Sequence, residues 1–133
     1  MGIQVSLPAG GDPTFGFTYF ASDHAAIRAD LGLGITSISG ASQQFSLEVG
    51  LRYYIADFDH FMPFVQPGIW ISNPGSQIAF AVEGGLGGEY FVTNHFSFGA
   101  QTGIAFKVLA VQNASAIETF TTGTSSVFGQ FLW

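Results

Sequence analysis

Apolar and polar residues alternate along most of this chain. Phe45, Leu47 and Val49, for example, alternate with Ser46 and Glu48. A repeat of two residues is the pattern of a β-strand whose two faces meet different surroundings. Further segments with this alternation are 15–19, 27–35 and 96–107. The pattern therefore predicts an all-β protein.

Clusters of Gly, Pro, Ser, Asn and Asp interrupt the alternation and predict the connections. The interruptions lie at residues 8–13, 22–24, 36–43, 57–60, 72–76, 93–95 and 112–115. They leave eight strands, at roughly residues 3–8, 14–20, 26–35, 44–55, 62–71, 78–91, 96–108 and 119–133. The length fits one domain over residues 1–133.

The uncharged run 61–82 is long enough for a membrane helix, but it contains Pro63, Pro67 and Pro74. Three prolines are hard to place in one spanning helix. In a strand, Pro63 and Pro67 fall on the outer face, and each removes a backbone donor. They predict a bulge or local irregularity near the start of the strand at 62–71.

A weak repeat, G-x-x-Y-[FY], supports this division of the chain. It begins at Gly16, Gly50 and Gly87, and each copy is followed by Asp or Asn and then His. The copies start 34 and 37 residues apart, from 50 − 16 and 87 − 50, which is the length of one hairpin. The three turns are therefore expected at one end of an up-and-down meander of eight antiparallel strands.

Two architectures fit this meander, a soluble barrel with an apolar interior and a membrane barrel with an apolar exterior. Apolar residues make up 47% of the chain and charged residues only 9%, with 18 Gly and 15 Phe. The polar face is mostly Gly, Ala, Ser, Thr and Gln, whereas the other face carries large residues. An eight-stranded interior only just holds its side chains, so the small residues are expected inside. The pattern predicts an eight-stranded antiparallel transmembrane β-barrel.

The charged residues separate in the same way. Seven are expected to point into the lumen: Arg28, Asp30, Glu48, Arg52, Glu83, Glu89 and Lys107. The others fall in connections or at strand ends: Asp12, Asp23, Asp57, Asp59 and Glu118. None remains on the lipid face, where a charge at mid-membrane costs about 2–4 kcal/mol.

Composition narrows the function further. Three basic residues against nine acidic ones make nucleic acid a poor partner. The chain has no cysteine, and no metal-ligand spacing or cofactor motif is present. The N-terminus lacks the basic start and apolar core of a signal peptide. His24, His60 and His95 lie on different hairpins, so they are expected around a rim rather than at one metal site.

In these features the chain resembles the small eight-stranded outer-membrane barrels of Gram-negative bacteria, the OmpA/OmpX type. The resemblance rests on the repeated strand ends, the Gly-rich segment 83–90 and the aromatic carboxyl terminus. It implies that the barrel-assembly machinery reads Ser126, Phe131 and Trp133 in the last strand, with Phe128 at the position usually held by glycine. Tyr19, Tyr53 and Tyr90 are expected at the membrane–water interface.

The resemblance also implies a lumen closed by ion pairs, Arg52 with Glu48 or Glu89 and Lys107 with Glu83 or Glu89. The expected function is a non-catalytic, monomeric barrel in the outer-membrane bilayer, without cofactor, that serves as a structural element or a narrow low-conductance passage.

Two alternatives remain open at this point. The first is a soluble lipocalin-like barrel that binds a hydrophobic ligand. The second is a lipid A deacylase, because His95-Phe96-Ser97 is similar to the His-x-Ser of those outer-membrane enzymes. In that case Glu118 is the only later acid.

Overall fold

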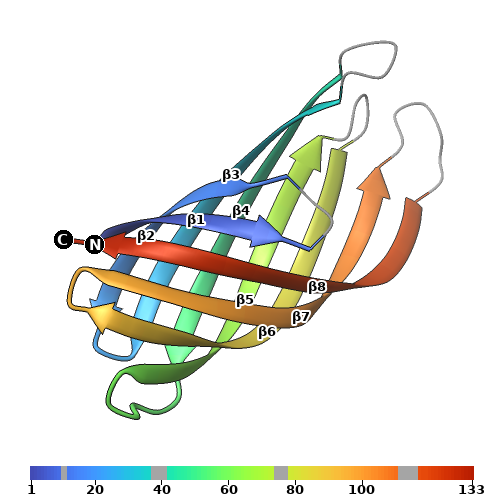
Figure 1. Ribbon diagram of the computed structural model, residues 1–133. Coiled ribbons are helices and arrows are strands. Elements are labelled where there is room, and N and C mark those ends of the chain that lie inside the picture. The colour runs from blue at the N-terminus through green and yellow to red at the C-terminus, as the bar shows by residue number, and fades with distance from the viewer. Residues whose placement is uncertain (10–11, 37–41, 74–77, 111–116) are drawn as a thin grey trace.

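In the computed structural model, eight antiparallel strands form one closed barrel (Figure 1). Each strand pairs with the next along the chain, and β1 pairs with β8 to close the wall. The strands are β1 (Gly2–Pro8), β2 (Thr14–Ser22), β3 (Ala25–Thr36), β4 (Ser42–Tyr54), β5 (Phe61–Asn73), β6 (Ile78–Thr93), β7 (Phe96–Ala110) and β8 (Ile117–Leu132). The predicted up-and-down barrel is confirmed.

The structure describes residues 1–9, 12–36, 42–73, 78–110 and 117–133. The predicted connections at 36–43, 72–76 and 112–115 lie largely outside this part of the chain. Within the described ranges, no helix is long and apolar enough to cross a membrane.

Large apolar side chains point outward and polar ones inward, as the alternation predicts. Phe17 is 62% exposed, whereas Arg52 and Glu89 are both fully buried. Phe45 and Val49 are exposed on the outer wall. A lipocalin-like barrel needs the opposite arrangement, so that alternative is wrong.

The three repeated turns lie at one end of the barrel together with both termini, and we call this the turn end (Figure 1). The backbone carbonyl of His24 accepts the N–H of Tyr54, that of His60 accepts the N–H of Phe91, and that of His95 accepts the N–H of Leu132, each at 2.8 Å. Each turn is thus bound to the end of a strand from the next hairpin. The repeat marks equivalent positions around this rim.

Two of these turns share a further local structure. The hydroxyl of Ser22 accepts the backbone N–H of His24, and Thr93 does the same for His95. The strand register shifts just before each turn, between Phe20 and Ser22 and again between Phe91 and Thr93. Such bulges increase the local twist and help a strand turn at a barrel rim.

Of the bulge or local irregularity expected near Pro63 and Pro67, β5 shows no bulge but a local interruption of its pairing with β4. Pairing with β6 runs without a shift from Phe61 to Ser72. Pairing with β4 keeps one register and is interrupted only opposite Gln66 and Pro67. The prolines lie on the outer wall, where β5 loses two backbone donors but keeps its register.

The hairpin of β1 and β2 is shorter than the other three (Figure 1). These strands have 7 and 9 residues, whereas β3 to β8 have between 12 and 16. The wall is therefore lower on one side of the barrel. We call the end opposite the turn end, toward which β3 and the longer hairpins extend, the loop end.

Candidate functional site: the lumen of the barrel

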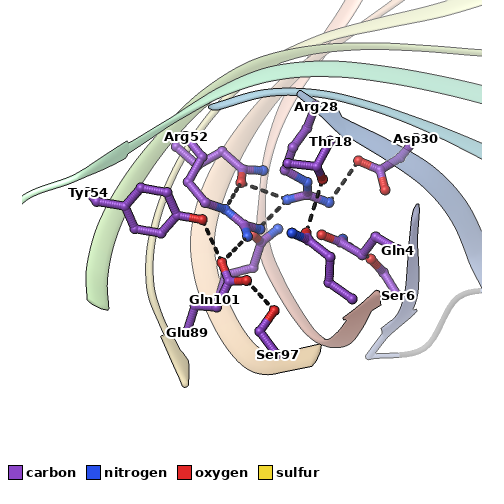
Figure 2. A network of polar contacts seen from close by, with 12 residues as sticks. Gln4, Ser6, Thr18, Arg28, Asp30, Arg52, Tyr54, Glu89, Ser97 and Gln101 are labelled. Carbon is purple, nitrogen blue, oxygen red and sulfur yellow. Dashed lines mark hydrogen bonds and ion pairs between the residues drawn. The ribbon is translucent and has the colours of Figure 1, made fainter. Parts of the chain in front are cut away.

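A buried ion pair crosses the lumen in the half nearer the turn end. A guanidinium nitrogen of Arg52 on β4 lies 2.7 Å from a carboxylate oxygen of Glu89 on β6. The hydroxyl of Tyr54 donates to the same oxygen at 2.7 Å, and Ser97 donates to the other oxygen. Figure 2 shows these four side chains converging from three strands. Buried charges need such partners, because removal from water is costly.

A second ion pair lies beside the first. Arg28 contacts Asp30, its neighbour two residues along β3, at 2.7 Å (Figure 2). The amide oxygen of Gln66 accepts from Arg28 at 2.6 Å and from Arg52 at 3.1 Å. Gln101 adds a further acceptor for Arg28 at 3.3 Å. One amide thus joins the two guanidinium groups into a single network.

Aromatic rings enclose the Arg52 guanidinium. Its central carbon lies 4.1 Å from the ring centre of Phe64 and 4.3 Å from that of Phe128. A guanidinium over an aromatic face is attracted by the ring's electron distribution, more so when both groups are out of water. Phe20 and Tyr54 extend the aromatic layer with centroids 6.1 Å apart. We call Arg52, Glu89, Tyr54, Phe64 and Phe128 the plug.

Glycines on β6 and β7 provide the space for the inward rings. A Cβ on Gly87 would lie only 2.6 Å from the Phe64 ring, and a Cβ on Gly99 would overlap the Phe128 ring. Both glycines therefore allow a close approach between ring and wall. The Gly-rich segment of the sequence thus has a packing role in the lumen.

Toward the loop end the lumen opens into a cavity of about 660 Å³, which we call the vestibule. Its lining includes the charged residues Glu48, Glu83 and Lys107 and the half-buried ring of Trp70. The Lys107 ammonium lies 4.8 Å from the centre of that ring. The lumen is therefore filled near the turn end and hollow near the loop end.

All seven charges predicted for the lumen lie on its inner wall, and none is on the exposed outer face. The structure brings Arg52 to Glu89 and Arg28 to Asp30. Glu48 is reached by the Gln66 amide at 3.4 Å.

The predicted interface tyrosines, Tyr19, Tyr53 and Tyr90, are exposed on the outer wall near the turn end. Phe131 and Trp133 lie at the same end, exposed and with ring centres 6.5 Å apart. Ser126, the third residue of the predicted assembly signal, lines the vestibule. The tyrosines and the terminal aromatics thus share one rim, and Ser126 is separate from them.

The candidate His-x-Ser pair is not arranged for catalysis in this structure. Ser97 is fully buried and donates to Glu89. A ring nitrogen of His95 is 3.1 Å from the carbonyl oxygen of Leu132. Glu118 is on β8 at the far end of the barrel, paired with Leu109. Ser97 and His95 thus have separate partners.

The sequence analysis missed the aromatic half of the plug. Phe64 was given no place in the lumen, and Phe128 only a position in the predicted assembly signal, although both stand at even positions of strands whose even positions face inward. Their even position, together with glycines on other strands, is the signal that could have identified them. Gln66 and Trp70 follow the same register.

No protein-family model and no curated protein matches the chain. Its fold is similar to that of the N-terminal β-barrel domain of Pseudomonas aeruginosa OprF, with a TM-score of 0.63, 15% identity, and coverage of 98% of this chain and 94% of that one. For neisserial surface protein A the TM-score is 0.60 and the identity 12%, with 99% of this chain and 94% of that one covered. For the Yersinia pestis outer-membrane protein Ail in a phospholipid bilayer nanodisc, the TM-score is 0.53 and the identity 10%, with 98% of this chain and 96% of that one covered. The chain therefore has the fold of the small eight-stranded outer-membrane β-barrels.

Proposed function

We propose that this chain is an integral barrel of the bacterial outer membrane that is closed to ion flow and serves a structural or anchoring role. The observation that carries the proposal is the inverted distribution of side chains. Large apolar residues cover the outer wall, and the strand charges whose side chains the structure describes line the lumen. Hydrocarbon is the solvent that such an outer wall matches.

The plug supports the closed state. Arg52 and Glu89 are both fully buried, and the rings of Phe64 and Phe128 flank the guanidinium. An ion that crosses the lumen must displace these packed groups. At most a narrow, low-conductance passage is compatible with this arrangement.

The proposed orientation places the turn end in the periplasm and the loop end outside the cell. Three tyrosines then lie at the periplasmic membrane–water interface, where amphipathic rings are favoured: Tyr19, Tyr53 and Tyr90. The barrel acts as a monomer, and the assembly machinery reads Ser126, Phe131 and Trp133.

Refolding tests the membrane location. The denatured chain is added to phospholipid vesicles, and the product is examined by gel migration with and without boiling. A compact band that resists detergent until heated is expected. A monodisperse protein that stays soluble without lipid or detergent would refute the proposal.

Planar-bilayer recordings test the closed lumen. The native chain is expected to give little current, and the double variant F64A/F128A to give a stable, larger one. The matched control F17A/F98A removes two outward rings, which are exposed on the wall, and is expected to conduct as little as the native chain. Large stable channels from the native chain would contradict the plug.

A further inference from the structure

The short hairpin leaves two strand edges without neighbours toward the loop end. The last pair between β1 and β8 is Pro8 with Ser126, extended by a 2.8 Å bond from the N–H of Ala9 to the carbonyl of Ser125. The last pair between β2 and β3 is Thr14 with Gly32. Beyond these pairs, within the described chain, β8 has no partner on its β1 side and β3 none on its β2 side.

The vestibule reaches this break in the wall. Its lining includes Pro8, Ala9 and Thr14 of the short hairpin, and also Gly123 and Ser125 of β8. Gly123 and Ser125 belong to the outward-facing, exposed set of β8. The cavity is thus lined both by the end of the short hairpin and by β8 beside the break. We call this opening, with its sill at Pro8, Ala9 and Thr14 and its side at Gly123 and Ser125, the slot.

The slot lies at the level of the apolar outer band. On one side, Gly123 is paired with Ile104, which is 54% exposed, and Thr121 is paired with Phe106, which is 63% exposed. On the other side, Leu33 continues β3 past its last β2 partner and is 74% exposed. The slot therefore faces hydrocarbon, given the proposed membrane location.

A strand edge in hydrocarbon needs polar partners, because each unsatisfied backbone group costs several kcal/mol. The edge of β8 carries hydroxyl residues on both faces, with Thr122 and Thr124 lining the vestibule and Thr121 and Ser125 facing outward. The slot is thus a polar gap in an apolar wall, suited to a molecule that is polar at one end and apolar at the other.

The vestibule has the size and the charges for the polar end. Its volume of about 660 Å³ falls within the roughly 300–1,000 Å³ of small-molecule sites. Arg28 and Lys107 contribute positive charge to its lining, and Glu48 and Glu83 negative charge. Charges of both signs in one site fit a zwitterionic headgroup.

We propose that the slot is a lateral passage by which a single-chain amphiphile with a zwitterionic headgroup exchanges between the vestibule and the outer leaflet. The headgroup occupies the vestibule beside Trp70, and the acyl chain leaves over the sill into the bilayer. This inference rests on the proposed membrane location but is independent of the anchoring role.

Quenching of Trp70 by bromine provides the test. The variant W133F leaves Trp70 as the sole tryptophan of the chain and is placed in nanodiscs of unbrominated phospholipid. Lysophosphatidylcholine with bromine on the proximal half of its acyl chain is then titrated. Saturable quenching of Trp70 is expected, whereas a brominated diacyl phospholipid is expected to quench little.

Two matched glycines of β8 test the route. A Cβ on Gly123 or on Gly129 meets no atom within 4 Å, so either position accepts a larger side chain. G123F narrows the slot and is expected to weaken the apparent affinity about tenfold. Gly129 lies below the sill, where it pairs with Val5. G129F is therefore expected to leave the apparent affinity unchanged. T122F, which fills the vestibule from its inner wall, is expected to act like G123F.

Gel migration and nanodisc incorporation are measured for every variant. A protein that does not insert into the bilayer is thereby distinguished from one that inserts but has no lateral passage. Incorporated protein whose Trp70 is not quenched would overturn the lateral passage, as would equal affinities for G123F and G129F. A disulfide-linked dimer formed by G123C would also overturn it, because a second copy would then cover the edge of β8.

Discussion

Glu89 offers the sharpest test of the plug, because its carboxylate has three donors and no contact with solvent. Arg52 and Tyr54 both donate to the same carboxylate oxygen at 2.7 Å, and Ser97 donates to the other oxygen. In Glu89→Ala the Arg52 cation stays buried without its carboxylate partner and keeps the Gln66 amide, which accepts from it at 3.1 Å. Breaking a buried ion pair in this way costs about 3–5 kcal/mol.

Two further variants separate charge from packing. Glu89→Gln keeps the shape and most hydrogen bonds but removes the charge. A bond to a charged group contributes about 1.5–3 kcal/mol and a neutral one about 0.5–1.5. The bonds from Tyr54 and Ser97 both become neutral, so a loss of about 2–3 kcal/mol is expected. R52M/E89L removes both charges, and exchange of a buried pair for apolar residues is often neutral. Its remaining loss, about 1–3 kcal/mol, comes from the hydroxyls left on Tyr54 and Ser97.

The free energies of unfolding are measured by reversible urea titration in phospholipid vesicles, followed by tryptophan fluorescence and by gel migration without boiling. The native chain is expected to have the highest free energy of unfolding, followed by E89Q and then E89A. The double variant R52M/E89L is expected to be clearly more stable than E89A. A double-mutant cycle gives the coupling between Arg52 and Glu89. A loss below about 1 kcal/mol for E89A, the range of solvent-exposed pairs, would refute the reasoning, since it would mean that water reaches the carboxylate.

Three further predictions follow from the packing and the outer wall. Gly87→Leu places its side chain against Phe64 and is expected to cost about 1–3 kcal/mol of unfolding free energy, whereas Gly84→Leu, whose Cβ is free of contacts within 4 Å, is expected to change it little in the same urea titration. Ile69→Arg puts a charge in the outer band between Val49 and Val82 and is expected to cost about 2–4 kcal/mol, with Phe58→Arg in a turn as the nearly neutral control. Phe128→Ala is expected to lower stability by about 3–5 kcal/mol and to make Arg52 accessible to an arginine-specific reagent, read by mass spectrometry; an unreacted Arg52 would argue against its enclosure by the ring.

The strands, and the side of the wall toward which each side chain points, could be predicted because both depend on the local sequence pattern. A period of two assigns every residue of a strand to one wall once a single residue is placed. Arg52 and Glu48 placed the polar set of β4 inside, and the remaining charges agreed with it. The three turns could be matched because the repeat recurs at hairpin spacing, and their shared carbonyl bonds to the next strand explain why they are alike.

The sequence narrowed the partner of Arg52 to Glu48 or Glu89 but could not choose between them, because pairing across a barrel depends on the stagger of strands distant in sequence. Arg28 pairs within its own strand with Asp30, a pair that was not among those predicted. The aromatic plug was missed for a related reason. Phe64 fits inside only because Gly87 on another strand leaves room for its ring, and this match of volumes exists only once the barrel closes.

Strand length divides the barrel into two regions with different chemistry. At the turn end all eight strands are present, so the lumen can be packed to the density that shields Arg52 and Glu89 from water. Toward the loop end β1 and β2 have ended, and six strands cannot close the same circumference with every backbone group paired. The hydroxyl-rich edge of β8 and the charged vestibule lie in that second region. A longer first hairpin would therefore complete the wall and remove the slot while leaving the plug intact, so the seal against ions and the lateral opening are separable features of one fold.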